Sequence, residues 1–287
     1  MFANLFIVLQ YLLPQHWLTA VVWRIARIRI PAIKNFLITR FVKLYDVDVN
    51  EVLLSVPDDF ATFNKFFVRE LEDHARPVDQ AEDSVVSPVD GTVSAAGPVR
   101  GDSILQAKGI DYSLDDLLST DLVDARAYVD GCFATIYLAP YNYHRVHMPF
   151  NGELVAARDV PGNLFSVNAA TVARVKGLFR RNERLIMHFK TAHGPAALIL
   201  VGALNVGSIS TLWSGEIRPR KHGVVDALDL SPHATTLHKG DLLGWFNMGS
   251  TVIVLMPANA CTWDDVLTPG ATLRMGEVIG KSGVAAA

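Results

Sequence analysis

One short stretch near the C-terminal end, residues 247–256, limits what this chain can fold into more than any other part of it. Its second half, residues 252–256, is Val-Ile-Val-Leu-Met, an apolar and mostly β-branched run that predicts a buried strand. Residues 249–251, directly before it, are Gly-Ser-Thr. Because glycine permits strained backbone geometry, the Ser250 hydroxyl can reach the Gly249 carbonyl carbon. The stretch therefore predicts a buried strand that begins at a candidate nucleophile.

A serine hydroxyl is a weak nucleophile and needs a base within hydrogen-bond reach. The sequence offers His144 and His147 in the run Tyr-His-Arg-Val-His, and a carboxylate, Asp90, in the run Ser-Pro-Val-Asp-Gly. Each run is common by itself. Gly-Ser-Thr usually begins a strand, Asp-Gly usually forms a tight turn, and two histidines three residues apart often only pack or face solvent. Spacing alone does not separate the roles of the two histidines.

Together and in this order, the segments of the chain resemble those of the bacterial-type phosphatidylserine decarboxylases. The matching runs are Phe-Phe-Val-Arg-Glu-Leu (66–71), Arg-Pro-Val (76–78), Ser-Pro-Val-Asp-Gly (87–91), Tyr-His-Arg-Val-His (143–147), Asn-Leu-Phe-Ser-Val-Asn (163–168), Gly-Leu-Phe (177–179), Arg-Asn-Glu-Arg (181–184) and Met-Gly-Ser-Thr (248–251). The resemblance covers nearly the whole chain. One departure is Met248, where the family commonly has leucine, and both residues are apolar.

The resemblance implies conversion of phosphatidylserine to phosphatidylethanolamine and CO2, a step of phospholipid biosynthesis. Loss of CO2 leaves electrons on the α carbon that no ordinary side chain absorbs, so an electron sink is needed. No glycine-rich phosphate-binding loop stands near a lysine, which argues against pyridoxal phosphate. The family makes its sink from the chain. By resemblance, Ser250 attacks the Gly249 carbonyl, and elimination and hydrolysis leave a pyruvoyl group on an α chain of residues 250–287, apart from a β chain of residues 1–249.

The resemblance also implies roles for the site residues. His147 takes the proton of the Ser250 hydroxyl, and Asp90 orients and stabilises that imidazole, as in hydrolase triads. His144 contacts the substrate and places a proton on the α carbon. Phe165 is a candidate for lining the substrate pocket, although a plain core position explains it equally well. No metal ion is expected.

The first 45 residues are apolar and basic. They hold six Lys or Arg and no Asp or Glu, whereas the rest of the chain has 20 basic and 29 acidic residues, a balance of −9. Apolar residues recur at helical spacing through 2–13, 17–29 and 31–45, with Trp and Phe opposite Arg and Lys. This composition is typical of helices that lie in a membrane interface, and it predicts an anionic membrane surface as a partner. A helical hairpin packed on the core is the alternative.

Residues 2–13 are too few to span a bilayer, and they lack the basic start and the cleavage site of a signal peptide. We therefore expect peripheral attachment to the cytoplasmic face of the cell (inner) membrane. Nucleic acid is not an expected partner, because the basic residues alternate with Leu, Ile, Val and Trp. Cys132 and Cys261 predict no disulfide framework and favour a reducing compartment. The sequence leaves open whether the protein is a homodimer.

Beyond residue 77 the pattern of the chain changes to β. Short apolar runs bounded by Gly and Pro recur at 84–87, 92–96, 132–138, 153–158, 185–190 and 196–204. Asp58 and Ser113 are each expected to cap a short helix. We predict an α+β protein with N-terminal amphipathic helices, then a mainly antiparallel β core, barrel-like or sandwich-like, with short helices. The expected division is a membrane-association region at 1–57 and a catalytic domain at 58–287.

Two other classes of protein share parts of this pattern. Pro-Val-Asp-Gly-Thr-Val at 88–93 resembles biotinyl-type and lipoyl-type barrels, which bind partners without catalysis, but those carriers present a lysine where this chain has Asp90 and Gly91. A metal hydrolase could use His144, His147 and Asp90, yet the sequence does not point to a complete ligand set with an open position. The intact mass separates these hypotheses, because only self-processing yields two fragments.

Overall fold

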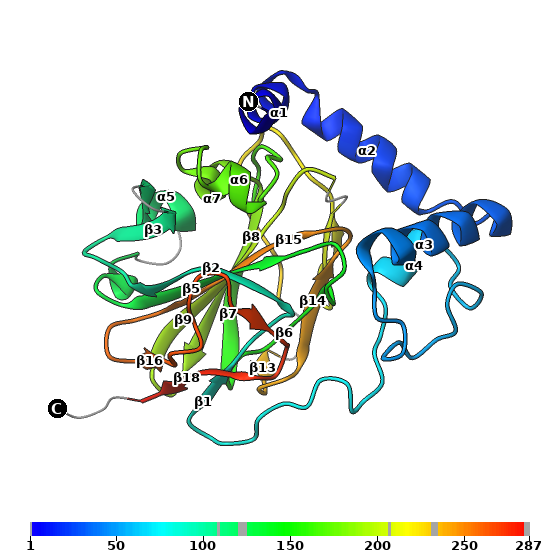
Figure 1. Cartoon of the computed structure of the whole chain (residues 1–287). Coiled ribbons are helices and arrows are strands. Elements are labelled where there is room, and N and C mark those ends of the chain that lie inside the picture. The colour runs from blue at the N-terminus through cyan, green and yellow to red at the C-terminus, as the bar shows by residue number, and fades with distance from the viewer. Residues whose placement is uncertain (1, 108–109, 120–124, 206–207, 231–234, 284–287) are drawn as a thin grey trace.

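The computed structural model describes residues 2–107, 110–119, 125–205, 208–230 and 235–283, and Figure 1 shows its course. The helices are α1 (Phe2–Leu12), α2 (Gln15–Ala26), α3 (Pro31–Tyr45), α4 (Phe63–Phe67), α5 (Leu114–Leu118), α6 (Ala169–Val172) and α7 (Leu178–Arg181), with a 3₁₀ turn at Ala125–Tyr128. The longer helices come first and strands dominate the rest, which confirms the predicted α+β class.

The strands of the described residues form one large sheet and three smaller ones, and every strand pairing in them is antiparallel. The nine-stranded sheet has the order β12 (Asp226–Ala227), β7 (Gly152–Val160), β8 (Arg184–Thr191), β9 (Gly194–Val201), β15 (Ser250–Met256), β5 (Cys132–Leu138), β2 (Gly91–Pro98), β17 (Thr272–Leu273), with β13 (Thr236–Leu237) also beside β7. The four-stranded sheet has the order β11 (Gly215–Ile217), β10 (Ile209–Thr211), β14 (Leu242–Phe246), β6 (Arg145–His147). The others are β1 (Ser84–Val86), β18 (Val278–Ser282), β16 (Cys261–Trp263), and the pair β3 (Ser103–Ala107) and β4 (Ile110–Ser113).

Strand β15 lies inside the large sheet, and all seven of its residues are buried. It pairs with β5 on one side, where Ser250 lies opposite Leu138, and with β9 on the other, where Thr251 lies opposite Val201. Because both faces of the strand are covered, its sequence is continuously apolar after the two hydroxyl residues. The prediction of a buried strand from the Val-Ile-Val-Leu-Met run is confirmed.

The N-terminal helices line one side of the molecule, with α1 above α6 and α7 (Figure 1). Proline sets two of their boundaries: Pro14 separates α1 from α2, and Pro31 occupies the first turn of α3. Of the 21 exposed large apolar side chains in the described residues, 12 lie between residues 8 and 45. This concentration marks an unusual surface. No described helix is both long enough and apolar enough to cross a bilayer.

Helices α3 and α4 share a second apolar cluster beside the main core. Its centre is an aromatic group in which the Phe41 ring lies 5.1 Å from that of Phe63 and 5.8 Å from that of Phe67. Trp245 and Met248, at the end of β14, pack against the same cluster. The helical region and the chain just before residue 249 are therefore in direct contact.

The cap of α4 differs from the prediction. Thr62 is the N-cap, and its Oγ1 accepts a hydrogen bond of 3.1 Å from the Lys65 backbone N–H. The expectation that Asp58 caps this helix is wrong, because Asp58 lies earlier in the chain and its carboxylate accepts from Asn35 instead. Ser113 caps α5 as predicted, by accepting from the Asp116 N–H.

Two of the six basic residues of the N-terminal region, Arg27 and Lys34, form hydrogen bonds or ion pairs with other residues of the protein. The Lys34 ammonium is buried and donates to the Pro57 and Asp58 carbonyl oxygens. Arg27 pairs with Glu216 at 2.7 Å and lies over the Trp23 ring. The side chains that remain exposed are those of Arg24, Arg29, Arg40 and Lys43.

Candidate active site

The chain enters β15 through Asn247, which is buried and fully hydrogen-bonded. Its backbone N–H donates to the Ser208 carbonyl oxygen at 2.9 Å. Its side-chain Nδ2 donates to the Ser208 and Ser210 hydroxyl oxygens, each at 2.9 Å, and its Oδ1 accepts from Asn64 at 2.9 Å. Asn247 thus holds the end of β14 against both β10 and α4.

The residue after it, Met248, has a φ of +110°, a backbone angle that L-residues rarely adopt. Its side chain packs against the aromatic cluster of α3 and α4, so the angle is held by contacts on both sides. Sequence reasoning located the strain at Gly249, whereas the unusual angle lies one residue earlier. Strain of this kind is typically stored at functional sites.

Ser250 and His144 meet this segment with their polar atoms unsatisfied. Both side chains are fully buried, and neither Ser250 Oγ nor His144 Nε2 has a hydrogen-bond partner among the described residues. A Cβ on residue 249 would lie 4.0 Å from His144 Nε2, so the imidazole borders Gly249. Buried polar atoms without partners are rare and call for an explanation.

The tautomer of His144 follows from its other nitrogen. Nδ1 donates to the Asn142 carbonyl oxygen at 2.8 Å, so Nε2 carries the lone pair of the neutral ring. Burial lowers the pKa of His144 to about 3, and the positive charge of Arg69 adds to this, although the Asn142 hydrogen bond opposes it. The Phe67 ring covers the imidazole at 4.1 Å. His144 is therefore uncharged at neutral pH and has an acceptor atom beside Gly249.

His147, three residues later, has a partner for each nitrogen. Nδ1 donates to the Gly240 carbonyl oxygen at 2.8 Å, and Nε2 accepts from the Tyr143 hydroxyl at 3.1 Å. Burial lowers the pKa of His147, while the Gly240 hydrogen bond and the charge of Asp90 raise it. The His147 backbone N–H donates to the Pro88 carbonyl at 2.9 Å, which brings the turn that carries Asp90 alongside.

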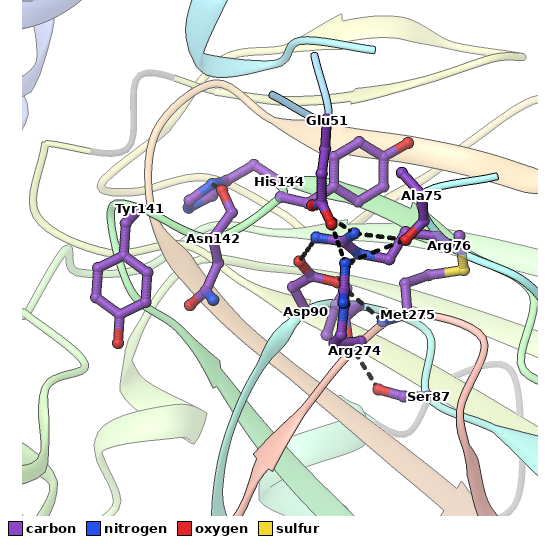
Figure 2. A network of polar contacts seen from close by, with 12 residues as sticks. Glu51, Ala75, Arg76, Ser87, Asp90, Tyr141, Asn142, His144, Arg274 and Met275 are labelled. Atoms are coloured by element: carbon purple, nitrogen blue, oxygen red, sulfur yellow. Dashed lines mark hydrogen bonds and ion pairs between the residues drawn. The ribbon is translucent and has the colours of Figure 1, made fainter. Parts of the chain in front are cut away.

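Asp90 itself is held by a different group. Both of its carboxylate oxygens accept from Arg76, at 2.8 and 2.6 Å, and Oδ1 also accepts from the Met275 N–H at 2.9 Å (Figure 2). Burial lowers the pKa of Arg76, but the hydrogen bonds and charges of Asp90 and Glu51 raise it above its ordinary value. Arg274 reaches Glu51 from the other side. No hydrogen bond joins Asp90 to His147 in the described residues.

Phe165 lies at the same end of the large sheet as Ser250. Its N–H donates to Asn182 Oδ1 at 3.0 Å, and Asn182 Nδ2 donates to the carbonyl oxygens of Phe165 and Gly202, each at 2.8 Å. Gly202 follows the residue that pairs with Thr251, so this group is next to the start of β15. The Phe165 ring is buried against Tyr11 of α1, 4.9 Å away.

The predicted site residues thus fall into two groups. Gly249, Ser250, His144 and Phe165 gather at the start of β15. Asp90 is bonded to Arg76 and His147 to Tyr143, in two neighbouring segments joined by the His147–Pro88 backbone bond. Their catalytic roles stay predictions. The sequence predicts no role for Arg76, Tyr143 or Asn247, although all three stand within or next to the family-like runs 76–78, 143–147 and 248–251. In the described part of the chain, no group of three or more His, Cys, Asp or Glu could hold a metal ion.

Comparison with known proteins gives a consistent family. A profile described as phosphatidylserine decarboxylase matches residues 63–281, and a second, described as PSD, matches residues 5–46. The phosphatidylserine decarboxylase proenzyme of Alcanivorax borkumensis is 46% identical over 273 residues, covering 95% of this chain and 94% of the relative. Those of Saccharophagus degradans and Methylococcus capsulatus are 44% and 45% identical over 278 residues, covering 97% of this chain and 97% and 96% of the relatives. With this extent of similarity over motifs and core alike, the chain belongs to the phosphatidylserine decarboxylase family.

Proposed function

We propose that the Gly249–Ser250 bond is cut by the chain itself, with Ser250 as nucleophile, His147 as its base and Asp90 as the carboxylate that stabilises the base. As a member of its family, the chain decarboxylates phosphatidylserine to phosphatidylethanolamine after self-processing, on a pyruvoyl group derived from serine. His144 and Phe165 contact the substrate in this proposal. The observation that carries it is that Ser250 Oγ, which follows Gly249 in the chain, and His144 Nε2, which borders it, are both buried and have no hydrogen-bond partner among the described residues.

The scission can be written with all atoms accounted for. Ser250 Oγ attacks the Gly249 carbonyl carbon, the C–N bond breaks, and the hydroxyl proton passes through the base to the released amine, which leaves an ester. Loss of the α proton of residue 250 then expels Gly249 as a free carboxylate. The resulting double bond shifts to an imine, and water hydrolyses it to the pyruvoyl group with release of ammonia.

The setting of the bond supports this chemistry. Ser250 is fully buried, so bulk water does not compete with its hydroxyl for the carbonyl carbon. The positive φ of Met248 strains the backbone immediately before Gly249. The charge of Asp90 favours the protonated form of His147, which is the form a base reaches when it accepts the hydroxyl proton.

The same pocket suits the pyruvoyl group. Because Ser250 Oγ makes no hydrogen bond with the described residues, replacing the serine by a keto group there breaks none. When formed, the group supplies the electron sink for decarboxylation. His144 Nε2 is next to residue 249 and has no partner in the described part of the chain, so it is the atom positioned to hold or deliver a proton at the substrate α carbon. Phe165 contributes an apolar wall.

A second assignment of the two histidines rests on a specific observation. His144 Nε2 borders Gly249 and is free, whereas His147 Nε2 is occupied by the Tyr143 hydroxyl. In this alternative, His144 is the base for scission. Under our first assignment, Tyr143 must turn its hydroxyl away before His147 can accept the Ser250 proton.

The test of scission is the intact mass of purified protein. We expect fragments of residues 1–249 and 250–287 from the unaltered chain and a single full-length, inactive chain from Ser250→Ala. Thr251→Ala is the matched control, because its hydroxyl is equally buried and without a partner in the described residues. Cleavage of the Ser250→Ala chain at the same bond would show that Ser250 is not the nucleophile.

We assign membrane association to residues 1–57 and catalysis to residues 58–287, with the protein peripheral on the cytoplasmic face of the inner membrane. The 12 exposed apolar side chains between residues 8 and 45 support this, as do the exposed cations among them. Each cation near an anionic surface contributes on the order of 1 kcal/mol. An anionic membrane surface is therefore the proposed partner.

Vesicle flotation tests this assignment. Arg24→Glu with Arg29→Glu reverses two exposed charges of the helical region, and Lys190→Glu with Lys281→Glu makes the same change on β8 and β18. We expect only the first pair to lower recovery, on vesicles with phosphatidylglycerol but not on neutral ones, and less so at high salt. Equal recovery of both pairs would mean that the docking face lies elsewhere.

A further inference from the structure

A cavity of about 260 Å³ opens at the corner between α1 and α2. Tyr11 and Leu13 line it from the end of α1, and His16 and Trp17 line it from the start of α2. Arg181 and Lys221 also line it. The corner lies above α6 and α7 in Figure 1, on the side of the molecule where exposed apolar side chains gather. Phe165, which we assign to the substrate pocket, also lines the cavity, whereas Asp90, His147 and Ser250, to which we assign scission, do not.

The charged side chains that are known to line the cavity are positive. Among the described residues, its lining holds two cations, Arg181 and Lys221, and no Asp or Glu. Arg181 lies over the Phe165 ring at 4.9 Å and donates to the Tyr11 hydroxyl at 3.2 Å, but neither it nor Lys221 forms an ion pair within the described residues. A guanidinium fixed by aromatic rings, with no counter-charge, is well suited to bind an oxyanion.

His16 gives a second and independent indication. Its Nε2 is buried and has no hydrogen-bond partner in the part of the chain that the structure describes. Burial lowers the pKa of His16, and the charges of Lys221 and His222 lower it further, against a hydrogen bond with the Gly162 backbone. An anion in the cavity would offset those two charges and so favour the protonated ring, whose Nε2–H can donate a hydrogen bond to the anion.

The rim of the cavity is apolar and exposed. Trp17 is 64% exposed, Tyr11 is 53% exposed and Leu13 is 38% exposed. The cavity is smaller than the roughly 300–1,000 Å³ of sites that enclose a whole drug-sized ligand. The cavity therefore fits the compact polar part of a ligand whose apolar part stays outside, over the rim. A membrane lipid is such a ligand.

We propose that this cavity binds the phosphodiester headgroup of an anionic glycerophospholipid other than the substrate, at Arg181 and Lys221, with the acyl chains lying over Leu13 and Trp17. The lipid would hold the α1–α2 corner to the membrane by one specific contact in addition to the diffuse attraction of the exposed cations.

The corner that the lipid would hold is attached to the loop on either side of Phe165. Gln15 Oε1 accepts from the Leu164 N–H at 2.8 Å, and Gln10 Oε1 accepts from the Ser166 N–H at 2.7 Å. If Phe165 lines the substrate pocket, which rests on the proposed function, a bound lipid also steadies that wall. The binding site itself does not depend on this assignment.

The experiment measures binding of dihexanoyl-phosphatidylglycerol, kept below its micelle concentration, by isothermal titration calorimetry. We expect saturable binding with one site per chain. Arg181→Gln with Lys221→Gln should weaken it at least tenfold, and Arg181→Lys should retain part of it. Arg174→Gln with Lys176→Gln is the control, because these exposed residues of the same region carry the same charge but do not line the cavity. The control should bind as the unaltered protein does.

Three further arms make the result decisive. Inorganic phosphate at the same concentration should bind far more weakly, since it lacks the chains that contact the rim, and equal binding would reduce the site to a simple anion site. Lys221→Gln alone changes an exposed residue and should leave the fold intact, so it tests the site even if the double variant misfolds. It should weaken binding severalfold. Dihexanoyl-phosphatidylserine should be decarboxylated with an unchanged KM by the Lys221→Gln variant, because Arg181, and not Lys221, lies over the Phe165 ring. A KM raised in parallel would make the cavity part of the substrate site, and equal lipid binding by the double variant and the control would overturn the proposal.

Discussion

His144 and His147 are three residues apart, yet their surroundings are opposite in kind. His144 is buried under Phe67, with one nitrogen bonded to a backbone carbonyl. Its other nitrogen borders Gly249 and has no partner among the residues that the structure describes. His147 lies in a polar cluster where both nitrogens are engaged and the charge of Asp90 is felt. The difference shows that one motif can supply two imidazoles with different chemistry, because burial and partners, not residue type, set what each can do.

The largest effect that tests this comparison is on the rate of scission. If His147 is the base, His147→Ala should slow the appearance of the 250–287 fragment by about 10²–10⁴-fold. His144→Ala should still cut but should decarboxylate poorly. Time courses of intact mass, followed by activity assays on the cut fraction, measure both steps. If His144→Ala blocks scission and His147→Ala does not, the two roles are exchanged and His144 is the base for scission.

The next effect separates a catalytic from a structural role of Asp90. Removing one partner of its buried pair with Arg76 costs about 3–5 kcal/mol of folding free energy. Asp90→Asn and Arg76→Gln should therefore lower the midpoint of thermal unfolding to a similar extent. Only Asp90→Asn should also slow scission markedly, by roughly 10²-fold or more. If both variants cut at the same reduced rate, Asp90 acts through stability alone.

A smaller effect is expected at Asn247, which positions the strained residue before Gly249. Asn247→Ala removes its bonds to Ser208, Ser210 and Asn64, so Met248 can relax. If the lost hydrogen bonds raise the activation free energy of scission by about 1–1.5 kcal/mol, scission becomes about tenfold slower. Once the chain is cut, the turnover number should be close to that of the unaltered enzyme. A fall in turnover equal to the fall in scission would indicate general disruption.

The smallest effect concerns acid stability. The pKa of His144 is about 3 in the fold, against 6.5 for an ordinary histidine. Between these values the unfolded chain binds more protons, so the free energy of unfolding falls as the pH drops below 6.5 and continues to fall towards pH 3. In a Ser250→Ala background, His144→Gln should show a shallower loss of stability from pH 6.5 to 4 by denaturant unfolding. An unchanged slope would mean that other groups dominate.

The sequence predicted the elements whose signal is local. The apolar run of β15, the helices bounded by Pro14 and Pro31, and the Ser113 cap each depend on neighbours along the chain, and all were confirmed. The partners of side chains depend on segments distant in sequence. No local pattern indicates that Arg76 donates to both oxygens of Asp90, or that the Lys34 ammonium donates to the Pro57 carbonyl. Nor does any local pattern indicate that Met248, rather than Gly249, has the positive φ.

The position of β15 has a consequence for what scission leaves behind. A cut at its first residue frees a fragment that contributes β15, β16, β17 and β18, and three of these strands pair with β9 and β5, with β2 and with β1 of the other fragment. Because β15 is hydrogen-bonded to a strand of the other fragment on each side, cutting the bond after residue 249 removes no strand pairing. To part, the two chains would have to dismantle the core of the domain. The mature protein is thus two polypeptides but one folding unit, and heating or denaturant should release the short chain only when the whole domain unfolds.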